Sequence, residues 1–284
     1  MKKFVSSILH LIQSMQSISS MQIKEEFKKN IRKTYLWSIF LGRFDAKSRI
    51  IKIAGYDFKC CTYWSFWWLF RQIFLEQAYF FTTGGKNPLI IDCGSNIGMS
   101  ILFFKLIYPD SEIIAFEPDE DAFVCLKENV ETCNFSFVSL NKKALSKFGG
   151  TIDFYYDEHN PGCLIASTVK ERLPKSERKV DSVKLSAYIE REVDFLKMDI
   201  EGAELSVIEE LSDSGKLNRV KQMAIEYHHH IIGREDMLSR MLHILEAAGF
   251  GYQVESRISR PFRRSEFQDV FIYAYRKDDG ILLD

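Results

Sequence analysis

The sequence predicts an α/β protein whose core is a mostly parallel sheet, and two observations support this prediction. From about Asn87 onward, short apolar runs alternate with amphipathic helical segments, which is the pattern of a parallel sheet covered by helices on both faces. Three of the runs end in glycine or acidic residues, at the edge where open α/β sheets bind ligands. We therefore expect a Rossmann-like domain over residues 87–277.

The strands and helices of this domain follow from apolar periodicity and from breaker residues. The expected strands are Pro88 to Cys93, Glu112 to Glu117, Phe135 to Leu140, Val193 to Met198, Val220 to Tyr227, Tyr252 to Arg257 and Phe267 to Tyr275. The expected helices are Ile97 to Tyr108, Asp119 to Cys133, Ala203 to Leu211 and Glu235 to Ala248. Pro109 ends the first helix because proline has no N–H to donate. The last two of the seven strands are expected to pair as an antiparallel hairpin with a long loop.

Two segments depart from this alternation. Residues 149–185 contain short β-like pieces around a turn at Pro161 and Gly162, and we interpret them as a β-rich insertion. Residues 1–86 are expected to be a mostly helical extension, which includes the aromatic run from Trp64 to Phe81 and ends at Gly84 and Gly85. We expect the aromatic run and the insertion to cover the pocket at the ligand-binding edge of the sheet.

Composition excludes several classes of protein. The chain of 284 residues is 46% hydrophobic, which is enough for a large core. Its 38 lysines and arginines balance 39 acidic residues, so we expect no nucleic-acid partner. No run of about 20 apolar residues is long enough to span a bilayer, and residues 1–16 are too polar for a signal peptide. We expect a cytoplasmic protein with reduced cysteines, while peripheral contact with a membrane stays open for the aromatic run.

A glycine turn joins the first strand to the first helix. Its sequence is Asp92-Cys93-Gly94-Ser95-Asn96-Ile97-Gly98. Glycine lets the backbone approach a ligand at this edge of the sheet, and Ser95 or Asn96 can cap the helix. A dinucleotide fingerprint would need glycine at positions 96 and 99, where the chain has Asn96 and Met99. The turn therefore favours a ligand without phosphates. The alternative is that its glycine only allows the chain to turn and contacts no ligand.

Acidic residues follow two further strands. Glu117 and Pro118 end the second strand, where a carboxylate can accept hydrogen bonds from the hydroxyls of a ribose. Helix capping is the alternative there, and Asp119 suits it better. Lys197, Asp199 and Glu201 end a later strand, and so many charges are too costly to bury without a purpose. A site is therefore expected at this edge.

These segments resemble the FkbM-type family of S-adenosylmethionine-dependent methyltransferases. The resemblance rests on the glycine turn, on Phe116-Glu117-Pro118, on Ala144-Leu145-Ser146 and, most specifically, on Lys197-Met198-Asp199-Ile200-Glu201-Gly202-Ala203-Glu204. It implies a class I methyltransferase fold, S-adenosyl-L-methionine as cofactor, and transfer to a hydroxyl of a small molecule, natural product or glycan. It also implies that Gly94 and Asn96 contact the methionine part of the cofactor, that Glu117 binds the ribose, and that Lys143 or Ala144 lines the adenine. The cofactor-binding residues expected in all are Asp92, Gly94, Ser95, Asn96, Gly98, Glu117, Pro118, Lys143, Ala144, Asp199 and Glu201.

Methyl transfer needs a group that removes the proton of the acceptor, and the same edge of the sheet supplies candidates. His228 is the first choice because its ordinary pKa lies near neutrality, and Asp199 and Glu226 are the other candidates. A metal site is the alternative for this histidine run, in which alternation would place His228 and His230 on one side. We expect no metal, since a common ligand set would need acids from elsewhere.

Two rival functions stay open at this point. A nicotinamide-dependent oxidoreductase is disfavoured by Asn96 and Met99, and a non-catalytic, membrane-peripheral protein would use only the aromatic run. The final hairpin loop adds four arginines, which would suit an acceptor with a phosphate, sulfate or carboxylate group. A solvated loop explains them equally well. They are Arg257, Arg260, Arg263 and Arg264.

Overall fold

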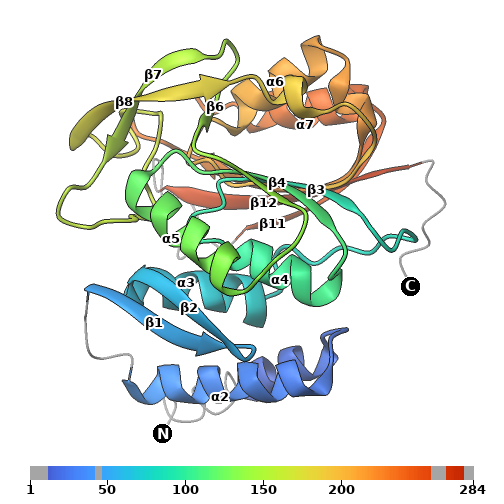
Figure 1. Ribbon diagram of the computed structural model, residues 1–284. Coiled ribbons are helices and arrows are strands. Elements are labelled where there is room, and N and C mark those ends of the chain that lie inside the picture. Colours follow the sequence, from blue (N-terminus) through green and yellow to red (C-terminus); the bar gives the residue numbers. More distant parts are fainter. Residues whose placement is uncertain (1–11, 42–46, 257–266, 278–284) are drawn as a thin grey trace, which may run out of the picture.

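A seven-stranded sheet forms the centre of the protein (Figure 1). The computed structural model describes residues 12–41, 47–256 and 267–277. In sheet order the strands are β11 (Phe250–Ser256), β12 (Gln268–Arg276), β10 (Val220–His229), β9 (Val193–Met198), β3 (Leu89–Cys93), β4 (Glu112–Phe116) and β5 (Val138–Asn141). All neighbours pair in parallel except β12, which is antiparallel to both β10 and β11. The predicted α/β fold with a C-terminal antiparallel hairpin is confirmed.

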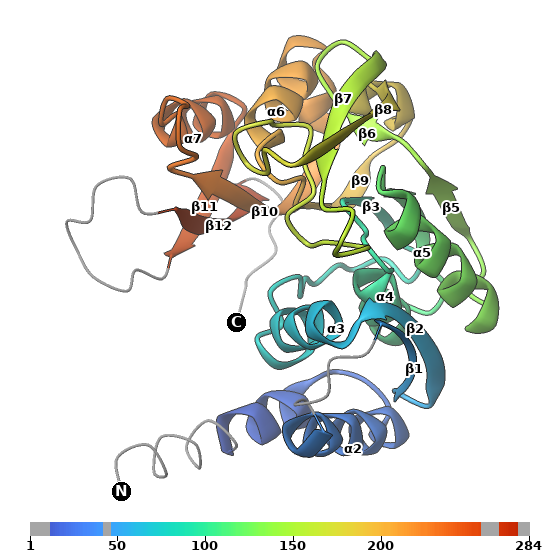
Figure 2. The same ribbon diagram turned by 90° about the vertical axis from the view of Figure 1, so that its left-hand side faces the viewer.

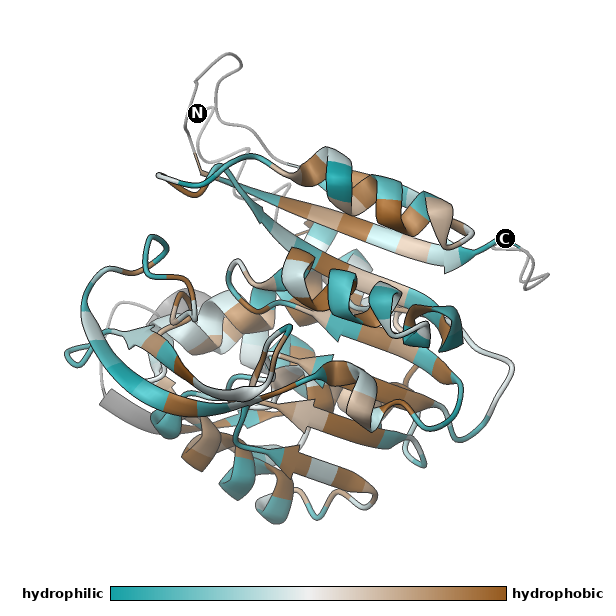
Figure 3. Ribbon diagram, turned by 90° about the horizontal axis from the view of Figure 1, so that it is seen from above, coloured by the Kyte–Doolittle hydropathy of each residue, from teal (hydrophilic) through white to brown (hydrophobic). Residues whose placement is uncertain are grey.

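Helices cover both faces of this sheet (Figures 1 and 2). The helices α4 (Met99–Ile107) and α5 (Glu120–Thr132) lie on one face, and α6 (Glu204–Asp213) and α7 (Leu238–Ala247) lie on the other. Short 3-10 turns, η2 (Leu185–Tyr188) and η3 (Lys216–Arg219), lead into β9 and β10. Because strand side chains alternate, Ile90 packs into one core while Leu89 and Ile91 pack into the other. Apolar residues accordingly run along the strands in Figure 3.

The predicted β-rich insertion is a small sheet of its own. It contains β6 (Ala144–Leu145), β8 (Ser176–Val183) and β7 (Gly150–Tyr156) in that order. The strands β7 and β8 pair antiparallel, and the segment between them returns to bridge Tyr155 with Ser167. This small sheet stands beside the carboxyl edge of the large one (Figure 2).

The N-terminal extension is helical, as predicted, but it also contains a hairpin that the sequence analysis missed. Helical structure covers residues 12–20, α2 (Glu25–Leu41), α3 (Tyr63–Phe70) and the π-helical turn η1 (Arg71–Leu75). Between these, β1 (Lys47–Ile53) and β2 (Tyr56–Thr62) pair antiparallel around Ala54 and Gly55. Both turn residues have positive φ, of 52° and 94°. Such a turn matches the twist of paired strands, and its signal is an Ala-Gly pair between two short apolar runs.

The extension shares a core with the sheet. Phe70 stacks on Phe74, with ring centroids 5.6 Å apart, and Phe74 meets Phe103 of α4 edge to face at 5.5 Å. All three rings are fully buried, so this part of the aromatic run packs on the domain. Among the described residues, no helix is both long and apolar enough to cross a bilayer.

One buried amide joins the hairpin of the extension to the domain. Asn129 of α5 accepts a hydrogen bond from the Lys59 N–H at 2.6 Å and donates to the carbonyls of Lys59 and Ile97, each at 2.8 Å. Its side chain therefore ties β2 to the loop before α4. A buried amide with all these partners contributes specificity as well as stability.

Replacing this amide tests how firmly the extension is held. We expect Asn129→Ala to lower the free energy of unfolding by about 1–3 kcal/mol, because three buried backbone groups lose a partner. The matched control is Glu128→Ala, which removes an exposed ion pair with the same Lys59 and should cost less than about 1 kcal/mol. Urea denaturation of both variants measures the difference, and equal losses would contradict the assignment.

Candidate functional site

A cavity of about 880 Å³ opens at the carboxyl ends of β3, β4, β9 and β10. Most residues that the sequence analysis selected line it together. These are Gly94, Ser95, Asn96, Glu117, Pro118, Lys143, Ala144, Asp199, Glu201, Glu226 and His228. The four strands are neighbours in the sheet, so their ends bring distant parts of the sequence to one place.

Two of the predicted cofactor-binding residues do not line the cavity. Asp92 is fully buried and accepts a hydrogen bond from Ser100 at 2.5 Å. Gly98 precedes α4 with φ of 87°, and a Cβ on it would lie 2.8 Å from Leu126. Both residues pack behind the glycine turn, and their contact with a cofactor stays a prediction.

The turn itself is fixed to two other strands. The N–H groups of Gly94 and Ser95 both donate to the carbonyl of Phe116, at 3.0 and 2.9 Å. Gly94 has φ of 84°, and a Cβ added to it would lie 1.8 Å from the carbonyl oxygen of Asp199. Glycine is therefore required here by the neighbouring chain as well as by its own backbone conformation.

The Gly94 position provides a stability test. We expect Gly94→Ala to lower the free energy of unfolding by at least about 2 kcal/mol, because the methyl group meets rigid backbone and the φ value is strained. Gly84→Ala is the control, since nothing lies within 4 Å of its Cβ position. Thermal and urea denaturation should separate the variants clearly, and a Gly94→Ala protein as stable as the control would refute the close approach.

Glu117 is buried and held by backbone at both oxygens. Its Oε2 accepts from the Asn96 N–H and its Oε1 from the Asp119 N–H, each at 2.7 Å. Burial, together with the charge of nearby Asp119, raises the pKa of this carboxyl to about 8, although the two backbone donors act in the opposite direction. Asp119 caps α5 through the Ala122 N–H at 2.9 Å, which is the capping role foreseen for it. Glu117 is therefore a hydrogen-bond acceptor that lines the cavity and is held in a fixed position by the backbone.

Lys197 and Asp199 lie directly against the glycine turn. The Lys197 ammonium is only 3% exposed and lies 3.3 Å from Asp92 and 4.0 Å from Asp199. Burial opposes its charge, but the two carboxylates outweigh burial and raise its pKa. Burial raises the pKa of Asp199 to about 6, although Lys197 acts in the opposite direction. Asp199 therefore titrates below neutral pH and is ionised above it.

His228 lies in the cavity wall as predicted, but its surroundings do not suit a general base. Its Nδ1 lies 2.9 Å from Glu204 and its Nε2 lies 3.2 Å from Glu201. Burial alone would lower its pKa, but these carboxylates outweigh it and raise the pKa well above the ordinary value. Carboxylates thus lie beside both ring nitrogens and favour the protonated form of the ring. These contacts favour a positioning role for His228, and its role as general base stays a prediction.

Several residues at the site escaped the sequence analysis. Arg172 of the insertion contacts Glu201 at 2.7 Å, and Asp269 of β12 lies 4.0 Å from His228. Gln72 and Tyr79 of the extension donate to Glu226, at 2.7 and 3.2 Å. Burial and Asp199 raise the pKa of Glu226 well above its ordinary value. No local motif marks these partners, because each is far from its contact in sequence.

The outer wall comes from the two segments that were expected to cover the pocket. Trp64 and Trp68 of the extension line the cavity and stay 61% and 43% exposed. The segment 163–168 of the insertion also lines the cavity. Both segments thus line the cavity, and the binding of an acceptor there stays a prediction. The four arginines of the final loop lie outside the described residues.

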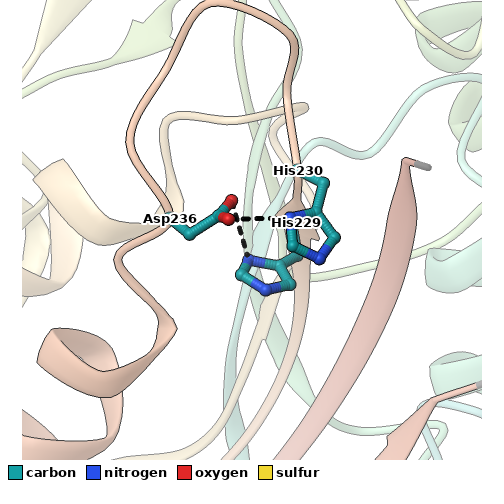
Figure 4. Close-up of side chains that lie close together, drawn as sticks. All are labelled: His229, His230 and Asp236. Carbon is teal, nitrogen blue, oxygen red and sulfur yellow. Dashed lines mark hydrogen bonds and ion pairs between the residues drawn. The ribbon is translucent and has the colours of Figure 1, made fainter. Parts of the chain in front are cut away.

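The histidine run does not alternate as expected. His228 faces the cavity, whereas His229 and His230 both turn to Asp236, with ring centroids 3.9 Å apart (Figure 4). The prediction that His228 and His230 share one side is wrong. Strand β10 ends at His229, and His230 takes a positive φ of 59°, which reverses the direction of its side chain.

Comparison with known proteins identifies the family. A model of the methyltransferase FkbM domain matches residues 92–252, which is more than half of the chain. The chain belongs to the FkbM methyltransferase family. The match includes the glycine turn, Glu117 and the whole Lys197–Glu204 motif, and its sheet has the order of a Rossmann-like methyltransferase.

Individual relatives are more distant. Methyltransferase 1 of Beauveria bassiana (strain ARSEF 2860) is 29% identical over 164 residues, and methyltransferase sdnD of Sordaria araneosa is 28% identical over 172 residues. The matches cover 50% and 49% of this chain, and 66% of each relative, just under two thirds of its length. A crystal structure of methyltransferase FkbM from Methylobacillus flagellatus KT is 20% identical, with a TM-score of 0.44 over 68% of this chain and 45% of that one.

Proposed function

We propose that this protein is an S-adenosylmethionine-dependent methyltransferase that methylates a hydroxyl oxygen of a small molecule or glycan. The observation that carries the proposal is a single cavity with two unlike ends. One end is the rigid glycine turn with Glu117, and the other is a cluster of carboxylates around Asp199. Membership of the FkbM family supports the reaction class.

The first end suits the cofactor. Glu117 is fixed by two backbone donors, and each of its oxygens keeps a second lone pair for a ribose hydroxyl. Asn96 has a left-handed φ of 45°, and its N–H donates to Glu117. Because asparagine stands here in place of glycine, the turn lacks the glycine that lets a phosphate approach the backbone. Lys143 and Ala144 line the wall beyond Glu117, where the adenine would lie. The bound cofactor supplies an activated methyl group on a sulfonium.

The second end suits the acceptor and the proton that it loses. A neutral alcohol is a poor nucleophile, so a base must accept its proton as the methyl group arrives. Asp199 meets the requirements for this base, because it faces the cavity, keeps 20% exposure and is ionised above about pH 6. The surrounding carboxylates also favour a positively charged sulfonium in the same cavity.

The other two candidates have different roles in this proposal. Both ring nitrogens of His228 are engaged by carboxylates, so it orients Glu201 and Glu204 rather than accepting a proton. Glu226 receives two hydrogen bonds from Gln72 and Tyr79, which hold it as part of the wall. Trp64 and Trp68 at the mouth can stack on the ring of a sugar or another cyclic acceptor.

The cofactor assignment predicts the effect of one substitution. At a pH above 8, where the Glu117 carboxyl is ionised, we expect Glu117→Ala to weaken S-adenosylmethionine binding by about 1.5–3 kcal/mol, or roughly 10- to 150-fold, because hydrogen bonds to a carboxylate are lost. Isothermal titration calorimetry measures the dissociation constant. Glu120→Ala is the control, since Glu120 makes only an exposed ion pair with Lys142. An unchanged dissociation constant in folded Glu117→Ala would remove Glu117 from the ribose role.

The base assignment predicts a pH profile. We expect Asp199→Asn to reduce turnover by about 10²- to 10⁴-fold with little change in cofactor affinity. In the unmodified protein kcat/KM should rise with pH through about 6, because the raised pKa of Asp199 leaves it protonated and inactive below that value. The substitution should abolish this rise. Full turnover in Asp199→Asn, together with its loss in His228→Ala, would return the role of base to the histidine.

A further inference from the structure

We propose that His229, His230 and Asp236 bind a divalent transition-metal ion of the zinc class, at a site separate from the cavity. None of the three lines the cavity, although His228 next to them does. The three ligand atoms, one from each side chain, all lie within 4.8 Å of one another. Figure 4 shows both imidazole rings and the carboxylate directed toward the same point.

The distances between the ligand atoms suit a single ion. The Nδ1 atom of His230 lies 2.8 Å from Asp236 Oδ2, and the Nδ1 atom of His229 lies 3.6 Å from Asp236 Oδ1. Ligands that bind zinc tetrahedrally at about 2.0–2.1 Å stand roughly 3.3 Å from one another. An ion between the three groups would therefore need only small side-chain rotations. Asp236 supplies the carboxylate ligand that the sequence analysis found missing from the histidine run.

An ion pair between His230 and Asp236 does not account for His229. Its Nδ1 atom is buried and, within the part of the chain that the structure describes, has no hydrogen-bond partner, since Asp236 Oδ1 lies 3.6 Å away, too far for a hydrogen bond. A buried polar atom without a partner costs about 1–3 kcal/mol, so this atom has a reason to be there. Coordination by a metal ion would satisfy it.

The backbone also favours a built site. His230 has a left-handed φ of 59°, a strained conformation for a residue with a Cβ, and it brings the two consecutive rings to one side. With extended backbone the rings would point to opposite faces of β10. Two imidazoles and one carboxylate are a typical three-residue ligand set for zinc, with the fourth position left to water.

The position of this site links it to the wall of the cavity. Ile231 follows His230 directly, and its Cδ1 lies 2.8 Å from where a Cβ of Gly202 would stand. Gly202 is the neighbour of Glu201, which holds His228. An ion bound at His229, His230 and Asp236 would therefore fix the segment that supports Glu201 from behind.

Direct metal binding tests this inference independently of methyl transfer. The full chain is stripped with a chelator and titrated with Zn²⁺ against a chromophoric competitor, and Co²⁺ spectra report the ligand type. We expect one tight equivalent in the unmodified protein. Asp236→Asn and His229→Ala should each weaken it by at least about 100-fold, more than the roughly 10- to 100-fold typical for losing a group that only supports a ligand.

Two control variants separate this site from its alternatives. His243→Ala removes an exposed histidine of α7 and should leave the affinity for Zn²⁺ unchanged. If the ion bound adventitiously to surface histidines, this variant would bind it more weakly. Glu201→Gln tests the rival group of Asp199, Glu201 and His228 inside the cavity, and it too should leave the affinity unchanged. Circular dichroism and urea denaturation establish that each variant is folded. The inference is overturned if no tight equivalent binds, or if Glu201→Gln loses the ion while Asp236→Asn retains it.

Discussion

The buried ammonium of Lys197 is the group on which the arrangement of the site depends. It lies 3.3 Å from Asp92 and 3.4 Å from the Cys93 carbonyl, and it also donates to the Gly94 carbonyl. An ammonium removed from water costs several kcal/mol unless such partners surround it. The end of β3, the glycine turn and the end of β9 must therefore stay together around this one charge. The same charge lies 5.3 Å from the ring centre of Tyr79, which brings the extension to the junction.

A second chain of charges organises the opposite wall. Arg172, Glu201, His228 and Glu204 alternate in sign from the insertion to the first turn of α6, and each contact is between 2.7 and 3.2 Å. Burial would raise the pKa of Glu201, but His228 and Arg172 outweigh burial and lower it. The three acids of the Lys197–Glu204 motif thus have different environments. Asp199 faces the cavity with its pKa near 6, while Glu201 and Glu204 hold a histidine.

The sequence was informative where the signal is local. Apolar periodicity located the strands of the sheet, and the glycine and acidic residues at their ends located the cavity, because parallel strands bring such ends to one edge. The partners of Glu226 could not be found in this way, since Gln72 and Tyr79 are 154 and 147 residues away from it. The alternation rule failed at His230 because one positive φ reverses it. Asp92 and Gly98 belong to the predicted motif, but Asp92 is hydrogen-bonded to Ser100 and Gly98 lies against Leu126, so neither lines the cavity.

The extension is a working part of the cavity, although the family match begins only at residue 92. Phe74 packs against Phe103 of α4 and Phe81 stacks on Phe195 of β9, so the extension cannot leave without exposing a shared core. Its polar side chains reach the part of the cavity around Asp199, where Tyr79 approaches both Glu226 and Asp199, at 3.2 and 3.5 Å. The part that we propose for the cofactor, by contrast, is built within the family domain from the turn and Glu117. If the proposed assignment holds, changes in the extension would alter which acceptor fits while the turn and Glu117 keep their geometry, because different segments of the chain anchor the two parts.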